Sequence, residues 1–276
     1  MNRDATAFFV NILVPLVTGA VYFIMAAEIK RVTKIRKLMF GEIGYNKAFT
    51  AFLLFGFYFV TRPLQNVLGP HPWPMVINSV RQFFLMAVIA PSILVGILHW
   101  VPSEKGTPKS TAVAAYAGGF LMAMIFILVN SMAIDGSKIL AEFGGWKIYD
   151  AKWFTSGSVS SSDFALPKAR LIVIHLITQL VTPVGYFLLA AAYVRHRRYN
   201  YPMSSVYNLI PKKWKYLEAG LLIFAISMIT AGFAAFFGQY YTYLWVIYFA
   251  ASAVAGVIEL ISVKIPPREA PADLQN

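Results

Sequence analysis

Seven apolar runs, each about as long as a lipid bilayer is thick, constrain what this chain can fold into more than any other feature. A helix needs about 20 mostly apolar residues to cross the hydrocarbon core, where helices and closed barrels alone satisfy all their backbone hydrogen bonds. The composition agrees, since 58% of the residues are hydrophobic and only 13% are charged. We therefore predict an all-α integral membrane protein, a single seven-helix bundle over residues 1–263. The expected transmembrane segments are 7–27, 48–66, 75–99, 111–133, 169–193, 216–237 and 241–263.

The basic residues alternate between the two sides of the predicted membrane. Most Lys and Arg residues lie in the first, third and fifth connections and in the C-terminal tail, and cytoplasmic loops retain such residues. We therefore expect the N-terminus outside and the C-terminus in the cytoplasm, with 264–276 as a disordered cytoplasmic tail. The net charge of +12 is on this interpretation a signal of topology, so no nucleic-acid partner is predicted. The pattern suits a multi-pass protein of the bacterial cytoplasmic (inner) membrane, and we interpret the first run as a retained helix rather than a signal peptide.

The stretch 62–82 is unusually polar for a connection between two membrane helices. It contains two arginines, two asparagines, two glutamines and three closely spaced prolines. We expect the segment 71–74, with the sequence HPWP, to form a rigid turn that holds Arg62 and Arg81 apart. Elsewhere, Pro15, Pro91 and Pro183 lie inside apolar runs, where each removes a backbone donor and is expected to kink its helix.

Helical spacing places polar residues on inward faces in the outer half of the predicted bundle. Tyr58, Arg62 and Asn66 are four residues apart, and His175, Gln179 and Thr182 form a second stripe. Buried ionisable groups in a membrane are costly and commonly line a cavity, and guanidinium groups bind carboxylate or phosphate in a bidentate manner. These faces predict an outward-facing pocket for a small anionic ligand. The predicted ligand-binding residues are Arg62, Asn66, Asn78, Arg81, Gln82, Asp135, Arg170, His175 and Gln179.

Two alternatives remain open for this polar group. The arginines could extend to the outer headgroups, or they could pair with Asp135 as an internal partner. His175 could be a polar side chain that bonds across helices, or it could act with Gln179 in ligand contact or proton relay.

No cofactor, metal site or catalytic residue is predicted. His175 is the one histidine inside an apolar run, and a haem held by two imidazoles needs a second at similar depth. A retinal Schiff base needs a lysine midway along the last helix, but the lysine there is Lys264 at its end. No motif of a serine hydrolase, zinc protease or phosphate-binding loop is present, and the chain has no cysteine.

The connections carry the remaining predictions. The basic stretches 28–47 and 195–215 suit contact with membrane lipids or a cytoplasmic protein partner. The longest connection, 134–168, contains an aromatic half that we expect to form an interfacial helix or a lid. Glu218 and Glu259, near the cytoplasmic ends of their helices, are expected to pair with neighbouring lysines.

These features favour a membrane receptor or sensor that passes a signal to a cytoplasmic partner. Two features support that hypothesis: the polar residues gather in the outer half of the bundle, and three helices are expected to be kinked. The overall organisation is similar to seven-helix sensor modules of bacterial membranes. No motif of a family matches residue by residue. Two alternatives remain. A subunit of a larger membrane complex would use the same residues against a partner, and a small-solute transporter or channel would need polar residues along the whole path.

Overall fold

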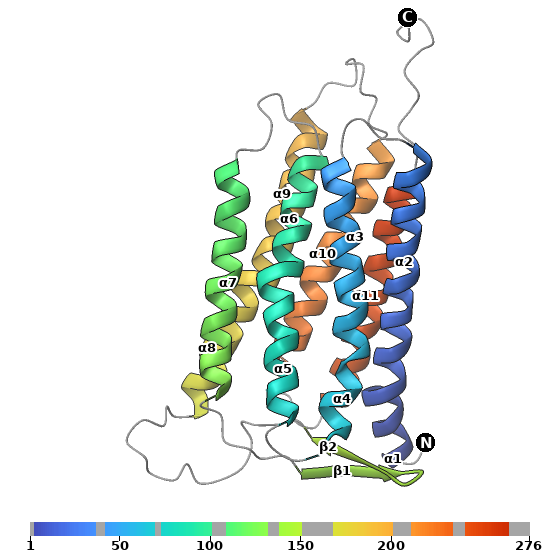
Figure 1. Cartoon of the computed structure of the whole chain (residues 1–276), viewed down its shortest axis with the longest axis vertical. Coiled ribbons are helices and arrows are strands. Elements are labelled where there is room, and N and C mark those ends of the chain that lie inside the picture. Colours follow the sequence, from blue (N-terminus) through green and yellow to red (C-terminus); the bar gives the residue numbers. More distant parts are fainter. Residues whose placement is uncertain are drawn as a thin grey trace, which may run out of the picture.

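The computed structural model describes residues 3–36, 42–69, 73–100, 109–131, 138–150, 168–200, 211–233 and 241–264. Within these ranges the protein is almost entirely helical. The helices join into seven rods that run alternately up and down a bundle (Figure 1). Their bounds are α1 (Arg3–Phe8), η1 (Phe9–Leu13) and α2 (Val14–Arg36); α3 (Glu42–Val60) and α4 (Arg62–Val67); α5 (Trp73–Phe83), η2 (Phe84–Ile89) and α6 (Ala90–Trp100); α7 (Lys109–Ser131); α8 (Lys168–Gln179), η3 (Leu180–Val184) and α9 (Gly185–Asn200); α10 (Pro211–Phe233); and α11 (Tyr241–Lys264).

Six segments of the described chain are long and apolar enough to cross a membrane, so this is a multi-pass membrane protein. They are Ala5–Lys34, Trp73–His99, Lys109–Ser131, Val173–Tyr199, Lys213–Gly232 and Tyr243–Lys264. The seventh rod, α3 with α4, is not among the six. Its helix α3 has 19 residues and lies between α2 and α6 in the middle of the bundle (Figure 1).

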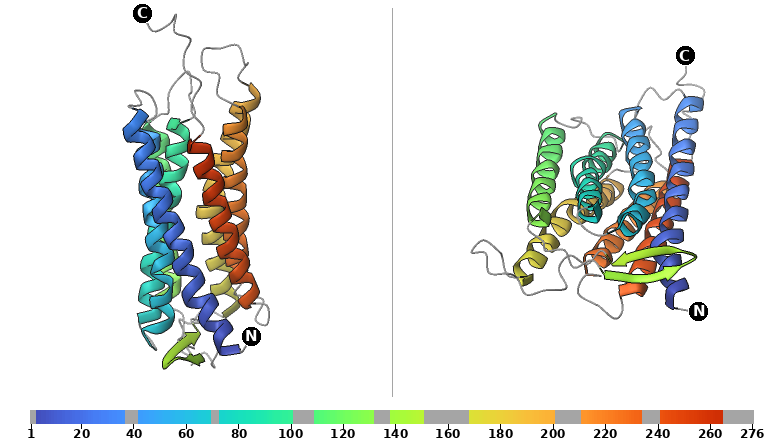
Figure 2. Two further views of the ribbon diagram at one scale, coloured as in Figure 1. Left: turned by 90° about the vertical axis from the view of Figure 1, so that its right-hand side faces the viewer. Right: turned by 60° about the horizontal axis from the view of Figure 1, so that its bottom comes forward.

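The two ends of the bundle differ, and we name them by what they carry (Figure 2). The hairpin end contains the N-terminus and two antiparallel strands, β1 (Lys138–Phe143) and β2 (Trp146–Asp150). At the basic end, α2, α6, α9 and α11 finish, and the described lysines and arginines of 28–36 and 195–198 lie there.

A π-helical turn accompanies each proline that lies deep inside a rod. The turn η1 ends two residues before Pro15, η2 ends two residues before Pro91, and η3 contains Pro183. The backbone N–H of the residue after each turn donates to the carbonyl five residues earlier, as from Ala90 to Leu85. Proline lacks a donor and its ring collides with the carbonyl one turn earlier, so the wider turn accommodates it. The predicted irregularities are therefore present as local widening of the helices.

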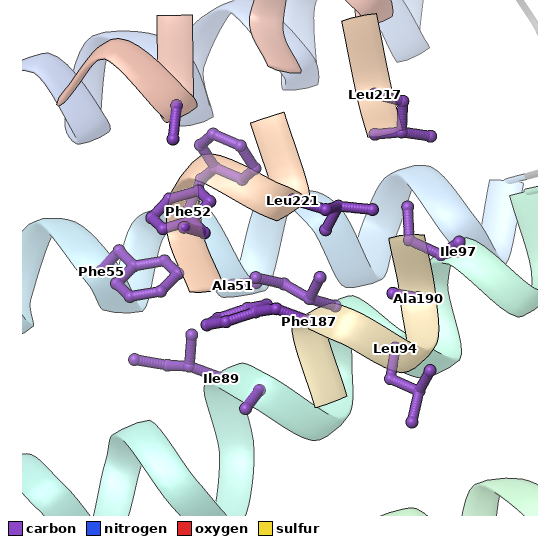
Figure 3. Close-up of a cluster of buried hydrophobic side chains, with 14 of the residues drawn as sticks. Ala51, Phe52, Phe55, Ile89, Leu94, Ile97, Phe187, Ala190, Leu217 and Leu221 are labelled. Atoms are coloured by element: carbon purple, nitrogen blue, oxygen red, sulfur yellow. The ribbon is translucent and has the colours of Figure 1, made fainter. Parts of the chain in front are cut away.

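The centre of the bundle is filled by aromatic rings from different rods. Phe55 of α3 stacks on Phe224 of α10, with centroids 5.2 Å apart and planes 9° from parallel. Phe187 of α9 covers the same Phe224 ring at 5.4 Å. Figure 3 shows Phe55 and Phe187 among the aliphatic side chains of α6 and α10. This apolar layer separates the polar groups of the hairpin end from those of the basic end.

Residues 138–150 form a β-hairpin, so the expectation of an interfacial helix is wrong for this part of the 134–168 connection. Gly144 and Gly145 have φ angles of 56° and 82°, the left-handed conformation that a tight two-residue hairpin turn requires. Ala141 and Ile148 pack against Ala7 of α1, and β2 lies against α4. The hairpin thus lies across the end of the bundle, where a lid was the other expectation, whereas 151–167 lie outside the described residues.

The basic stretches are more helical than expected. α2 continues to Arg36, α3 starts at Glu42, and α9 continues to Asn200, so much of 28–47 and part of 195–215 extend the bundle. Helix α11 likewise includes Lys264, and the remainder of the predicted tail lies outside the described residues.

Candidate anion site at the hairpin end

Two buried arginines share one acceptor at the hairpin end. Nη1 of Arg62 donates to Oε1 of Gln65 at 3.1 Å, and Nη1 of Arg81 donates to the same oxygen at 2.7 Å. Arg62 is 6% exposed and Arg81 is 4% exposed. The expectation that Arg62 and Arg81 are held apart is therefore wrong, because α4 and α5 lie side by side and both guanidinium groups meet at one amide oxygen. His71 and Pro72 of the expected turn lie outside the described residues.

Arg81 is fixed by α3. Its Nε donates to the backbone carbonyl of Tyr58 at 2.9 Å, and its guanidinium lies 4.3 Å from the centre of the Tyr58 ring. The hydrogen bond and the cation–π contact offset part of the cost of burying the charge. They also leave the Arg81 group little freedom to turn toward lipid headgroups.

Arg62 is held less completely. Its guanidinium lies 4.2 Å from the centre of the Trp245 ring of α11. Its Nε is buried and has no hydrogen-bond partner among the described residues. A buried N–H of a charged group without an acceptor is costly, so this atom marks a place where an acceptor is needed.

Among the side chains that the structure describes, no carboxylate forms an ion pair with either arginine; those of Asp4 and Asp150 lie outside that part. The described ion pairs involve Glu28, Glu142 and Glu218, and none of them includes Arg62 or Arg81. Asp135, the predicted internal partner, lies outside the described residues. Two guanidinium groups around one neutral oxygen form a positive site that a carboxylate or a phosphate fits chemically.

A chain of amides and hydroxyls connects the arginines to a third rod. Gln82 donates to the Tyr58 hydroxyl at 3.2 Å, and Gln179 of α8 donates to Oε1 of Gln82 at 2.9 Å. A separate bond joins Asn66 of α4 to Asn11 of η1 at 3.1 Å. The polar group therefore spans α3, α4, α5, α8 and η1, and two of its members adjoin π-helical turns.

The structure brings together most of the residues predicted for the site. Arg62, Arg81, Gln82 and Gln179 belong to one hydrogen-bonded chain, and Asn66 and Asn78 are buried nearby on α4 and α5. The ring of His175 lies 4.7 Å from that of Phe126 on α7. Arg170 lies in α8, but its side chain, like all of Asp135, is outside the described part.

Sequence reasoning missed three members of the site. Gln65 is the shared acceptor, and its position three residues after Arg62 on one helix was the available signal. Trp245 and Tyr248 are absent from the predicted site, yet Trp245 lies against Arg62, and Tyr248 is buried with its ring 5.4 Å from that of Trp245. The inward stripe of α11, which continues from Tyr248 through Ser252 to Glu259 at helical spacing, would have indicated their orientation.

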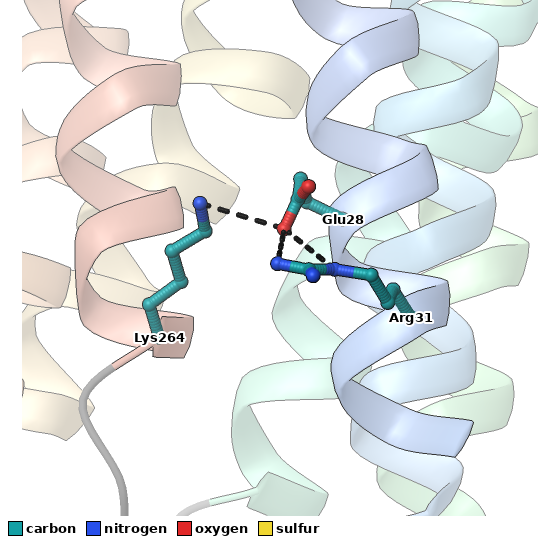
Figure 4. A network of polar contacts seen from close by, with 3 residues as sticks. All are labelled: Glu28, Arg31 and Lys264. Carbon is teal, nitrogen blue, oxygen red and sulfur yellow. Dashed lines mark hydrogen bonds and ion pairs between the residues drawn. The ribbon is translucent and has the colours of Figure 1, made fainter. Parts of the chain in front are cut away.

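Charges at the basic end follow a different pattern. Glu28 binds Arg31 at 2.9 Å and Lys264 at 3.4 Å, which ties α2 to α11 (Figure 4). Glu218 was expected to pair with a lysine, but it binds Arg198 at 2.9 Å instead. Glu259 was expected to do the same, but it lines a small cavity and has no ion pair among the described residues.

No protein family, curated protein or solved structure matches this chain. Within the described residues, no group of three or more His, Asp or Glu side chains is placed to hold a metal ion.

Proposed function

We propose that the protein is a membrane receptor or sensor that binds a small anion, carboxylate or phosphate in type, at Arg62 and Arg81. The observation that carries this proposal is the pair of buried guanidinium groups on the one Gln65 oxygen, which form no ion pair with any carboxylate side chain that the structure describes. An anion would supply the acceptor that Nε of Arg62 lacks and would balance charge that the amide cannot.

The proposed topology has seven membrane spans, with α3 and α4 as the seventh. α3 alone is about 28 Å long at 1.5 Å per residue, close to the hydrocarbon thickness. The hairpin end faces outside and the basic end faces the cytoplasm, because most of the described lysines and arginines lie at the basic end. This arrangement suits a bacterial inner membrane, with a protein partner at 28–47 and 195–215 and anionic lipids around them.

Binding would change the packing of the rods through Gln65. An anion that takes the arginines displaces the Gln65 oxygen, and Arg81 is bonded to α3 through the Tyr58 carbonyl. The next bonds lead to Gln82 and Gln179, just before η2 and η3. π-Helical turns interrupt the regular hydrogen bonding of an α-helix and occur often at functional sites, so we place the adjustment of these rods at those turns. The adjustment would reach the basic end through α6 and α9.

Calorimetry on the full chain in lipid nanodiscs tests the proposal. Acetate, succinate, inorganic phosphate and nitrate are titrated into the protein and into Arg81→Gln. The matched control is Arg197→Gln, which removes the same charge from α9 at the basic end, where Arg197 lies 5.4 Å from the Tyr193 ring. We expect at least one anion to bind, affinity to fall roughly 30- to 100-fold in Arg81→Gln, and no change in the control. Equal affinities in all three proteins, or no binding by any of these anions, would overturn it.

A subunit of a larger membrane complex is the second candidate. The observation in its favour concerns α7, which lies at the edge of the bundle (Figure 1). Only 28% of its most apolar 18-residue stretch is buried. In that case the anion would be a carboxylate side chain of the partner. Transport has less support, because the aromatic layer of Phe55, Phe187 and Phe224 separates the two polar regions.

A further inference from the structure

Glu259 is a buried acid that the anion site does not use. It lies on α11, about a turn and a half before the helix ends at Lys264, and is 4% exposed. Its Oε1 is buried and accepts no hydrogen bond from the described residues. Ionisable groups at such depth in a membrane protein are costly, so their presence generally serves a function.

The bundle leaves space for this side chain. A Cβ on Gly220 of α10 would come 2.5 Å from Cγ of Glu259 and 3.3 Å from its Oε1. The same Cβ would meet the Ala255 carbonyl at 3.2 Å. Any residue larger than glycine at position 220 would therefore displace Glu259, which shows that α10 and α11 pack around it.

A small cavity opens beside the carboxyl group. It lies between α3, α6, α10 and α11, and its lining includes Gly44, Phe52, Ile97 and Leu217, three of which Figure 3 shows in their apolar surroundings. The centre of a water molecule can move within about 20 Å³ of it. That is room for about one water molecule. Glu259 is the one ionisable side chain that lines the cavity in the described chain.

The described charged groups of α11 and α2 form no ion pair with Glu259. Lys264 of α11 binds Glu28 of α2, which also binds Arg31 (Figure 4). Tyr22 of α2 donates to the Ser252 carbonyl at 2.7 Å. η1, which also touches α11, carries no titratable side chain.

The described charged groups on α10, α3 and α6 form no ion pair with Glu259 and do not line the cavity. Glu218 of α10 binds Arg198, and Nζ of Lys213 lies 5.9 Å from the centre of the Trp214 ring. Lys47 of α3 donates to the Tyr116 hydroxyl at 3.0 Å, and His99 of α6 bonds the Val95 carbonyl at 2.8 Å. The remaining titratable side chains that the structure describes on these elements are Tyr45 and Tyr58 on α3 and Lys215 and Tyr216 on α10, and none of them lines the cavity. The side chains of Glu42 and Lys212 lie outside the described part.

The chemistry of these surroundings selects the ligand. An ionised carboxylate without a cation or donors is very unfavourable in apolar surroundings, whereas a protonated one is far less so. A hard metal cation needs about six oxygen ligands, and the side chains that line this cavity offer one carboxyl group. The ligand that fits is a proton.

We propose that Glu259 is a proton-binding site, occupied in the closed bundle and emptied when the basic ends of α3, α6, α10 and α11 separate enough to admit water. On release the O–H bond of the carboxyl breaks, the proton goes to water, and the carboxylate remains hydrated. Exchange is with the cytoplasmic side, a point that rests on the topology proposed above. The site shares no residue with the anion site, so either can fail without the other.

Infrared spectroscopy of the full chain in nanodiscs tests whether the group is protonated. The C=O stretch of a protonated carboxyl should be present at neutral pH, absent in Glu259→Gln and retained in Glu218→Gln, whose parent carboxylate pairs with Arg198. A band that is unchanged in Glu259→Gln, or no such band in the unmodified protein, would overturn the proposal. If Glu259→Gln does not assemble, Glu259→Asp keeps the acid and must shift the band, and an unshifted band overturns it equally.

Thiol labelling tests the coupling to opening, since the chain contains no cysteine. Ile97→Cys places a thiol on the cavity wall, and Tyr199→Cys, at a position 68% exposed, corrects for ionisation of the thiol itself. The corrected labelling rate should rise about tenfold per pH unit above neutrality and should not depend on pH once Glu259→Gln is added. A corrected rate that is independent of pH before that addition would overturn the coupling.

Discussion

The two ends of this bundle bury charge in opposite ways. At the hairpin end, two arginines are surrounded by amides, a carbonyl and aromatic rings, and their positive charge is permanent. At the basic end Glu259 is buried among apolar side chains and has no ion pair among the described residues, whereas Glu218 pairs with Arg198 and Glu28 pairs with Lys264. A group that cannot lose its charge must be given hydrogen bonds. A group that can lose its charge can be buried without them.

The strongest test of this difference between the two ends is to give the arginines a carboxylate of their own. Gln65→Glu keeps the size and position of the shared acceptor and adds the missing negative charge. We expect anion affinity to fall by roughly 100-fold, because the site is then occupied from within, and the protein to become more stable by about 1–3 kcal/mol. Calorimetry and thermal unfolding in nanodiscs measure the two effects.

Gln65→Leu is the control for that substitution, since it removes the acceptor without adding charge. It should destabilise the protein, and added anion should restore part of the loss. Unchanged anion affinity in Gln65→Glu would show that the arginines are not the binding groups.

At the other end, the space around Glu259 can be filled. Gly220→Val should destabilise the protein by about 1–3 kcal/mol, because its side chain collides with Glu259 and with the Ala255 carbonyl. Adding Glu259→Ala should recover about 1 kcal/mol or more by removing one of the two collisions. Unfolding free energies of the single and double variants give this coupling, and additive values would contradict the packing described for α10 and α11.

The connection between α3 and α8 should contribute less. Tyr58→Phe removes the hydroxyl that accepts from Gln82 and leaves the cation–π contact with Arg81 in place. We expect a loss of about 1 kcal/mol in unfolding free energy and a smaller change in anion affinity than in Arg81→Gln. A loss of affinity as large as that of Arg81→Gln would show that the hydroxyl contacts the anion itself.

The smallest effect is expected at the rim of the basic end. Glu28→Gln breaks the links to Arg31 and Lys264, but those side chains are 63% and 48% exposed, so solvent screens the pairs. We expect a change below about 0.5 kcal/mol, measured by thermal unfolding at low and high salt. A larger loss would mean that these pairs, rather than apolar packing, hold α2 against α11.

The sequence predicted the faces of the rods better than it predicted the contacts between them. Tyr58, Arg62 and Asn66 were placed on one inward face by their spacing, and all three are buried. The meeting of Arg62 with Arg81 was not predictable, because it depends on how α4 is rotated after the turn at Thr61 and on the left-handed Gly69 beyond it. Trp245 belongs to the site only because α11 lies beside α4, a neighbour relation that no local pattern encodes. Glu259 was assigned a lysine partner by proximity in sequence, whereas the rotation of α11 turns it toward α3 and α6.

The π-helical turn η2 has a consequence for how this protein could have evolved. Such a turn holds one residue more than a turn of α-helix, so it has the form of a single-codon insertion retained in the gene. Losing one residue between 84 and 89 would restore a regular helix and rotate everything before it, including Arg81 and Gln82, by about 100° relative to α6. The bundle could still fold after that deletion, but Arg81 would then face lipid. Chains that align with this one but carry a one-residue gap there would be expected to share its architecture and to lack the proposed anion site.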